Sequence, residues 1–321
     1  MIEFIKAIIF GIVEGITEWL PISSTGHMIL LDKFMPLQVS PEFWEMFLVV
    51  VQLGAILAVV VIYWKRLFPF YLQGETAPAT QNADGARSIY SARDADGANS
   101  TPGAPGIHSA HSARSAGERQ RRIRLDIPMM AMWGKIVIAS VPAAIVGLFF
   151  DEQLNALFYN EWTVAIMLIL FGILFIVIEN SSLSKNPRVH SIGEISCKAA
   201  FFIGIFQMIA AVFPGTSRSG ATIVGTLLLG ISRTAAAEFT FFLAIPAMLG
   251  GSALKLVKFG FHFTSQELLI LVTGMAAAYV VSVIAIKFLM GYIKKHDFKV
   301  FGWYRIILGL LILGWFILQC R

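Results

Sequence analysis

The sequence has few charged residues and almost no cysteine. Only 14% of its 321 residues are Asp, Glu, Lys or Arg, whereas an average soluble domain carries about 25%. With 57% hydrophobic residues, this composition excludes an ordinary soluble domain and indicates a membrane protein. The two cysteines, Cys197 and Cys320, have no metal-binding or redox spacing, so we expect no disulfide framework.

The net charge of +5 does not require a nucleic-acid partner. Many of the arginines lie in one hydrophilic stretch from Gln73 to Arg124, which is rich in Ala, Ser, Gly and Asp. Such a segment buries too little apolar surface to offset its chain entropy, so we predict a disordered insert there. Basic residues next to apolar segments mark the cytoplasmic side of a membrane. We therefore place the insert in the cytoplasm and expect no binding to nucleic acid.

Six stretches are long and apolar enough to cross a hydrocarbon core, which needs roughly 20 residues. They are about Phe43 to Trp64, Met130 to Phe150, Trp162 to Ile178, Ala235 to Val257, Leu268 to Met290, and Trp303 to Leu318. With six spans and a cytoplasmic insert after the first, both termini are expected on the outer side of the membrane.

Two further apolar stretches, about Ile5 to Leu31 and Ala199 to Leu229, are interrupted in the middle. The interruptions are Pro21-Ile-Ser-Ser-Thr-Gly-His27 and Pro214-Gly-Thr-Ser-Arg-Ser-Gly220. Proline removes a backbone donor, and glycine and serine favour turns, so neither break can continue a helix. Non-helical backbone at membrane depth survives only inside protein or beside a water-filled cavity. We therefore predict two re-entrant helix-loop-helix hairpins whose tips meet in the bundle interior.

The two hairpins also resemble each other, because a uniform shift of 193 residues places Gly11 on Gly204, Glu14 on Gln207 and Ser24 on Ser217. The predicted fold is all-α: a polytopic membrane protein with six transmembrane helices and two re-entrant hairpins in an inverted-topology repeat. Its single membrane domain, 1–321, divides into a first-repeat hairpin and span (1–70), the insert (73–124), two spans (130–180), a second-repeat hairpin and span (199–257), and two spans (268–318).

Acidic residues and a histidine surround the first break. Glu14 and Glu18 lie four residues apart on one helical face, where a charge at the bilayer centre costs roughly 2.5 to 3.5 kcal/mol. They need a shared metal ion, arginine or proton, unless both lie at an interfacial helix end. His27 follows Ser24 by three residues, close enough for the hydrogen bond between a nucleophile and its base. A histidine that only packs is the alternative.

The second break combines glycines, hydroxyls and Arg218. Glycines let backbone N–H groups approach an anion, hydroxyls add donors, and arginine binds phosphate bidentately. A helix starting near Ser219 would direct its positive end at the same ligand. An Arg218 that pairs with Glu14 or Glu18 for structure is the alternative, and the two interpretations are compatible.

The segments Glu14 to His27 and Pro214 to Thr222 resemble both motifs of the undecaprenyl-diphosphate phosphatase family, also called the bacitracin-resistance family. The resemblance covers nearly the whole chain, and the insert is longer than we expect in that family. It implies removal of the terminal phosphate from undecaprenyl pyrophosphate at a site open to the periplasm. This reaction recycles the lipid carrier for cell-wall synthesis, confers bacitracin resistance, and is expected to use Mg²⁺ or Ca²⁺.

The resemblance assigns catalysis to Glu14, Glu18, Ser24, His27 and Arg218. It leaves open whether Glu14 and Glu18 bind the metal directly, and whether Ser24 attacks phosphorus or His27 activates water. The expected substrate-binding residues are Ser23, Thr25, Gly215, Thr216, Ser217, Ser219 and Thr222.

Other functions fit parts of the sequence. A polyprenyl-phosphate transporter or flippase could have the same inverted repeat with broken helices. A structural membrane subunit would leave the buried polar residues unexplained, and the separated histidines of acid-phosphatase-like lipid phosphatases are absent from the sequence. A homo-oligomer stays open.

Overall fold

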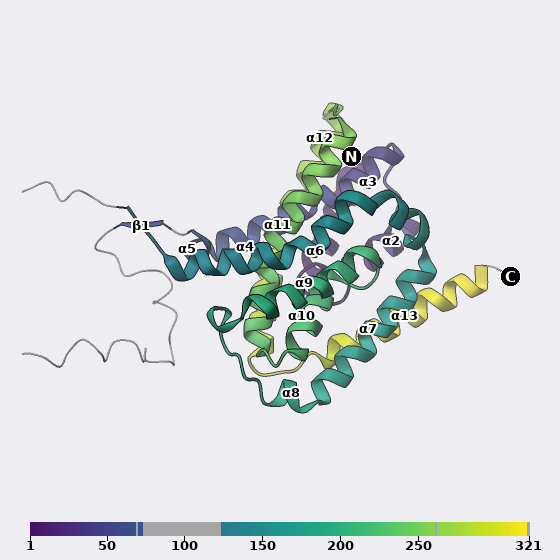
Figure 1. Ribbon diagram of the computed structural model, residues 1–321. Coiled ribbons are helices and arrows are strands. Elements are labelled where there is room, and N and C mark those ends of the chain that lie inside the picture. The colour runs from purple at the N-terminus through teal and green to yellow at the C-terminus, as the bar shows by residue number, and fades with distance from the viewer. Residues whose placement is uncertain (69, 73–122, 261, 320–321) are drawn as a thin grey trace, which may run out of the picture. The chain divides into compact units, whose positions relative to one another are not determined.

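The computed structural model describes residues 1–319 except 69, 73–122 and 261. These residues form two compact units, Met1–Trp64 with Ala131–Arg321, and Lys65–Met130, which are described separately. The helices are α1 (Ile2–Thr17), α2 (Ser24–Phe34), α3 (Pro41–Val50), α4 (Gln52–Ile62), α5 (Trp64–Leu67), α6 (Ile127–Phe158), α7 (Glu161–Asn180), α8 (Ser182–Lys185), the 3-10 helix η2 (Ile192–Glu194), α9 (Cys197–Val212), α10 (Arg218–Leu228), α11 (Arg233–Phe259), α12 (Ser265–Ile293) and α13 (Lys299–Gln319) (Figure 1).

The smaller unit contains an antiparallel pair of short strands, β1 (Phe70–Leu72) and β2 (Ile123–Leu125). The predicted disordered insert was too long at its C-terminal end, because Arg124 pairs with Tyr71 in this ladder. Aromatic and β-branched residues at the two ends of the insert favour such pairing. Residues 73–122 and Cys320 lie outside the described residues, so the predictions made for them stay predictions.

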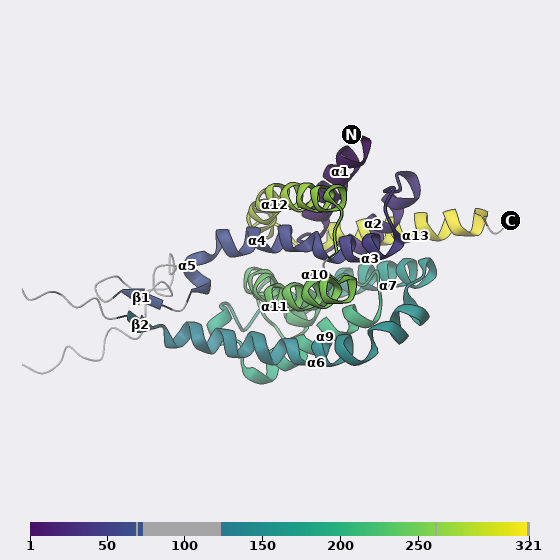
Figure 2. The same cartoon turned by 90° about the horizontal axis from the view of Figure 1, so that it is seen from above.

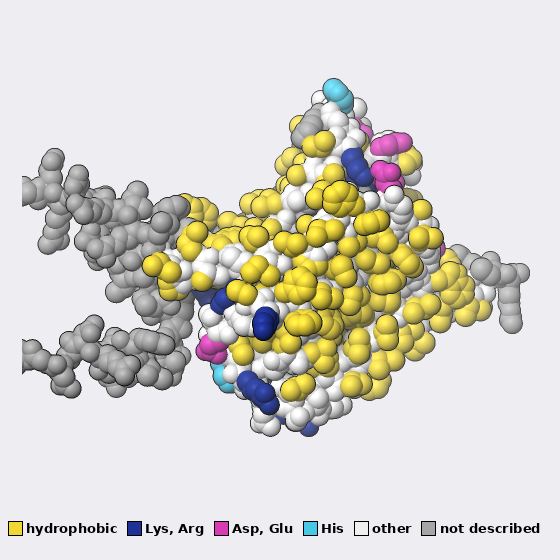
Figure 3. All heavy atoms as spheres, viewed as in Figure 1, with side chains coloured by type: hydrophobic (Ala, Val, Ile, Leu, Met, Phe, Trp, Pro, Cys, Tyr) yellow, Lys and Arg dark blue, Asp and Glu magenta, His cyan; other side chains and the backbone are white. Residues whose placement is uncertain are grey.

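The six predicted spans are confirmed. Helices long and apolar enough to cross a membrane cover Pro41–Ile62, Ile127–Phe150, Glu161–Asn180, Arg233–Phe259, Ser265–Ile293 and Lys299–Leu318. The first of them consists of α3 and α4, which continue into each other through Val51 in helical conformation. Figure 3 shows hydrophobic side chains over most of the visible face, with few charged ones between them. The chain is a multi-pass membrane protein.

Both predicted breaks separate two helices, α1 from α2 and α9 from α10, as the sequence indicates. Ser23 and Ser217 begin the second helix of each hairpin with positive φ angles of 75° and 67°. Each side chain accepts a hydrogen bond from the backbone N–H of a glycine, Gly26 at 3.4 Å and Gly220 at 3.1 Å. Residues other than glycine rarely adopt this conformation, so its recurrence supports a structural repeat. Re-entry of the hairpins into a bilayer stays a prediction.

The equivalent caps correct the register of the repeat. The uniform shift places Ser24 on Ser217, whereas the structure makes Ser23 the counterpart of Ser217. Only Ile22 lies between proline and cap in the first break, but Gly215 and Thr216 do so in the second. The second tip therefore contains one additional residue, and the predicted ungapped alignment is wrong there.

The first helix of each hairpin, α1 or α9, packs closely against another helix through a glycine at an equivalent position of the repeat. A Cβ atom added at Gly11 of α1 would lie 2.3 Å from the carbonyl oxygen of Gly274 on α12. At Gly204, the counterpart on α9, it would lie 2.4 Å from the carbonyl oxygen of Ala139 on α6. Both hairpins thus press a glycine against a helix of the other half of the chain.

Helices α7 and α13 pack against each other (Figures 1 and 2). A Cβ atom added at Gly172 would lie 2.7 Å from the carbonyl oxygen of Gly302, and one at Gly309 would lie 2.8 Å from that of Ala165. The two helices therefore run antiparallel, and exchanging them maps one contact onto the other. This is the arrangement that a pseudo-two-fold axis in the membrane plane requires of an inverted repeat.

Candidate active site

The two hairpin tips meet at a buried ion pair inside the larger unit. The guanidinium of Arg218, at the start of α10, donates a hydrogen bond to Oε1 of Glu18, which is only 6% exposed. Ser219 Oγ donates to the backbone oxygen of Glu18 at 3.1 Å, and Ser24 Oγ donates to Glu18 Oε2 at 2.8 Å. The predicted meeting of residues from the two breaks is therefore present.

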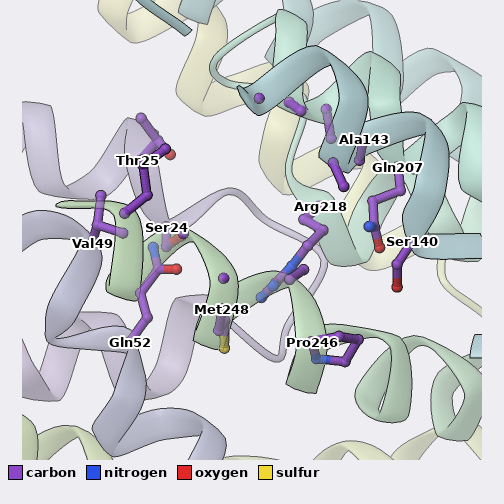
Figure 4. A pocket seen from close by; sticks show the side chains of 18 of the residues that line it. Ser24, Thr25, Val49, Gln52, Ser140, Ala143, Gln207, Arg218, Pro246 and Met248 are labelled. Carbon is purple, nitrogen blue, oxygen red and sulfur yellow. The ribbon is translucent and has the colours of Figure 1, made fainter. Parts of the chain in front are cut away.

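A pocket of about 420 Å³ lies beside this ion pair (Figure 4). Its size falls within the range of roughly 300 to 1,000 Å³ that is usual for small-molecule sites. Glu18, Ser24 and Arg218 line it together with small apolar residues such as Ala143 and Gly147. A pocket lined by both charged and apolar residues suits an amphiphilic ligand.

The N-terminus of α10 borders the pocket through Ser217, which caps the helix. The first N–H groups of a helix lack partners within it and carry the positive end of its dipole, so this end favours an anion. Gly215 also lines the pocket and has a φ angle of 89°. A Cβ atom there would lie 2.6 Å from the backbone of Val164, so only glycine fits this tip.

The predicted substrate-binding residues divide into two groups. Thr25, Gly215 and Ser217 line the pocket, whereas Ser23, Thr216, Ser219 and Thr222 do not. Thr222 Oγ1 bonds to the Arg218 carbonyl at 2.9 Å and to Thr240 Oγ1 at 3.0 Å. Thr222 therefore stabilises the second tip from outside the pocket. Ser219 does the same through its hydrogen bond to the backbone of Glu18.

The carboxylate pair does not form a metal cage. Glu14 is 1% exposed, its Oε1 has no hydrogen-bond partner, and it does not line the pocket. Both carboxylate oxygens of Glu18 already accept from Arg218 and Ser24. Among the described residues, no group of three or more His, Cys, Asp or Glu is placed to hold a metal ion. The unpartnered oxygen of Glu14 fits a cation only if phosphate and water supply most of its oxygen ligands.

His27 does not pair with Ser24, contrary to the predicted hydrogen bond. Its Nδ1 lies 2.7 Å from the backbone oxygen of Ser23, and its Nε2 lies 2.6 Å from the hydroxyl of Tyr304 on α13. A carbonyl only accepts, so Nδ1 carries a proton. The two rings are stacked at 5.6 Å. The prediction is wrong because both ring nitrogens have other partners, one of them on a distant helix.

Sequence reasoning missed polar residues on the other side of the pocket. Gln207 of α9 is 3% exposed, lines the pocket, and has no hydrogen-bond partner for Oε1. Figure 4 shows Arg218 between Ser24 and Gln52 on one side and Gln207 and Ser140 on the other. The match of Gln207 to Glu14 in the repeat was the signal that could have identified it.

Comparisons with known proteins agree with the resemblance. Residues 7–311 match the family model described as bacitracin resistance protein BacA. The chain is 56% identical over 316 residues to an undecaprenyl-diphosphatase of Desulfitobacterium hafniense, covering 98% of this chain and 97% of the relative. It is 54% identical over 317 residues to undecaprenyl-diphosphatase 1 of Clostridium acetobutylicum, covering 99% and 98%. Because the matches cover nearly all of both chains, these relatives leave little room for an insert much shorter than that of this chain. The expectation of an unusually long insert does not hold for them. The chain belongs to the bacitracin resistance protein BacA family.

Proposed function

We propose that this protein hydrolyses undecaprenyl pyrophosphate to undecaprenyl phosphate and inorganic phosphate, recycling the lipid carrier for cell-wall synthesis and conferring resistance to bacitracin. The observation that carries the proposal is the cluster of Glu18, Ser24 and Arg218, which joins the two hairpin tips beside the pocket. Several relatives are named undecaprenyl-diphosphatase.

Arg218 and the start of α10 would bind the terminal phosphate. Arginine presents a planar fork that matches phosphate oxygens, and the helix adds N–H groups and a positive end. A phosphate that takes the Arg218 fork leaves the Glu18 carboxylate free to accept a proton. Binding of the phosphate to Arg218 is thereby coupled to the activation of Ser24 by Glu18.

Ser24 is the nucleophile in this proposal, and Glu18 is its base. Their hydrogen bond of 2.8 Å is the arrangement that activates a hydroxyl group. The Ser24 oxygen bonds to the terminal phosphorus, the bond from phosphorus to the bridging oxygen breaks, and undecaprenyl phosphate leaves. The Ser24 proton passes to Glu18, and water then hydrolyses the phosphoserine. His27 orients the first turn of α2 through its hydrogen bond to the Ser23 carbonyl.

A divalent cation, Mg²⁺ or Ca²⁺, belongs to the proposal as a partner that enters with the pyrophosphate. Glu14 and Glu18 are the carboxylates that would contact it, with phosphate oxygens and water as the other ligands. The cation would neutralise charge on the phosphates. The dependence of phosphate release on added Mg²⁺ after chelation tests this part.

The proposal includes a location in the bacterial inner membrane, with the pocket open toward the periplasm. The support is the distribution of Lys and Arg in the sequence. Basic loops lie on one side of the predicted spans, whereas the segment from Asp151 to Glu161 contains no Lys or Arg. The state of assembly, a single chain or a homo-oligomer, is decided by light scattering of the purified protein.

The decisive experiment is phosphate release by the purified protein in detergent. Undecaprenyl pyrophosphate should yield one inorganic phosphate per molecule consumed, because hydrolysis needs no membrane. A transporter or flippase, the alternative with this architecture, releases none. Absence of phosphate release with and without Mg²⁺ or Ca²⁺ would contradict the proposal and favour transport.

A further inference from the structure

Arg305 lies in the first half of α13, is fully buried, and contacts both hairpin tips. Its Nη2 donates hydrogen bonds to the carbonyl oxygens of Gly215 at 3.0 Å and Thr216 at 2.7 Å. Its Nη1 donates to the carbonyl oxygen of Pro21 at 3.3 Å. One guanidinium thus joins backbone from two segments that are far apart in the sequence.

This arginine has no carboxylate partner in the described part of the chain. Its hydrogen-bond partners in the described part of the chain are all backbone carbonyls, including that of Met167 at 3.5 Å, and its Nε has no hydrogen-bond partner. A buried charge is costly, and apolar residues of similar volume often replace buried charges without loss of stability. Packing alone therefore does not account for an arginine at this position.

The contact with Thr216 fixes the direction of one backbone donor. A trans peptide is planar, so its C=O and N–H point in opposite directions. The Thr216 carbonyl points at Arg305, and the N–H of the same peptide belongs to Ser217, which lines the pocket. No described group accepts a hydrogen bond from this N–H. It is therefore available as a donor to an anion bound next to Ser217.

We propose that Arg305 is a positioning residue that holds the two hairpin tips together and directs the Ser217 N–H at the phosphoryl group being transferred. This inference rests on the proposed phosphatase function. Donors that are held in place before the reaction stabilise developing charge at little reorganisation cost. Arg305 acts through the backbone and does not touch the substrate.

Gly220 supports this arrangement independently. A Cβ atom at Gly220 would lie 2.8 Å from Arg305 Nη1 and 3.2 Å from the Cβ of Ser217. Gly220 has an ordinary helical position in α10, so backbone conformation does not require glycine there. Glycine is required there because the guanidinium of Arg305 occupies the space next to a Cβ atom.

The test compares Arg305→Lys with Arg233→Lys. Arg233 is a control because it is another mostly buried arginine, but it pairs with a carboxylate, Glu179, at 2.5 Å and does not line the pocket. In Arg305→Lys, kcat per folded molecule should fall about 10²- to 10³-fold, as on loss of an oxyanion donor, with KM nearly unchanged. Inhibition by orthovanadate, which resembles the transition state, should weaken in parallel, while inhibition by inorganic phosphate should not.

Hydrogen exchange gives a readout that does not depend on activity. Arg305→Lys should speed amide exchange in 20–26 and 214–220 together, whereas Arg233→Lys should leave both segments unchanged. Unchanged exchange at the tips, or equal losses of kcat per folded molecule in both variants, would overturn the role of Arg305. If the wild-type protein releases no phosphate, the proposed function fails, and exchange still decides whether Arg305 holds the tips.

Discussion

At the scale of single residues, the chemistry depends on which group takes the proton of Ser24. Ser24 donates to Glu18, whereas His27 is occupied by Ser23 and Tyr304. Glu18 also accepts from Arg218, so a single carboxylate connects the nucleophile to the phosphate-binding arginine. The removal of one hydroxyl group can therefore separate covalent catalysis from direct attack by water.

Replacing Ser24 with alanine should reduce phosphate release at least about 10³-fold, because it removes the attacking oxygen. Acid-quenched turnover of the wild-type protein should yield a peptide phosphorylated at Ser24, detected by mass spectrometry. His27→Gln is the comparison: it should retain phosphoserine formation, since His27 does not contact Ser24. A Ser24→Ala variant with nearly normal rate would instead assign the attack to water.

How much of the site the sequence could predict also becomes clear at this scale. The meeting of Glu18 with Arg218 was predictable, because buried charges in an apolar bundle need partners. The partner of His27 was not, since Tyr304 reaches it only through the packing of α13 against the rest of the bundle. Arg305 was visible as a charge inside a predicted span, but its function depends on carbonyls whose direction no sequence pattern reports.

At the scale of helices and hairpins, small apolar residues that line the pocket come from three different elements. Gly147 lies on α6, Ala210 and Ala211 on α9, and Gly250 on α11. A Cβ atom at Gly147 or Gly250 would meet nothing within 4 Å, so there is room beside the backbone. Small residues along such a groove would leave space for the first isoprene units of the lipid.

Filling this groove should affect long substrates more than short ones. Gly147→Leu should raise KM for undecaprenyl pyrophosphate about tenfold or more, while kcat/KM for isopentenyl pyrophosphate stays near the wild-type value. Gly134→Leu is the matched control, because Gly134 lies on the same helix, also has open space around it, and does not line the pocket. Equal losses on both substrates would show that the groove does not hold the lipid chain.

The long elements followed from the sequence, and the short ones did not. Spans and breaks are set by apolar length and by proline, which act locally. The ladder of β1 and β2 depends on two three-residue segments, too short for a periodic signal. The additional residue in the second tip was hidden for a similar reason: an alignment of apolar helices has little to distinguish neighbouring registers.

At the scale of the whole molecule, the two halves share a backbone plan but carry different side chains. The repeat sets Gln207 opposite Glu14, and the equivalent caps set Arg218 opposite Ser24. Acid and nucleophile thus come from one half and the arginine from the other. This asymmetry suits an enzyme that acts on one phosphate. A transporter, in contrast, would expose the same site to each side of the membrane in turn.

The same architecture makes the orientation testable with the native cysteine. Cys197 is exposed, begins α9, and is expected on the cytoplasmic side together with Lys198. In a Cys320→Ser background, a membrane-impermeant maleimide added to spheroplasts should not label Cys197 but should label it in inverted vesicles. A variant that carries Gln153→Cys as its single cysteine, with Cys197→Ser and Cys320→Ser, should be labelled in spheroplasts but not in inverted vesicles. The reason is that Gln153 follows the second span, in the segment without Lys or Arg. Labelling of Cys197 from outside would reverse the orientation and place the pocket on the cytoplasmic side, where it could not process a carrier released at the outer surface.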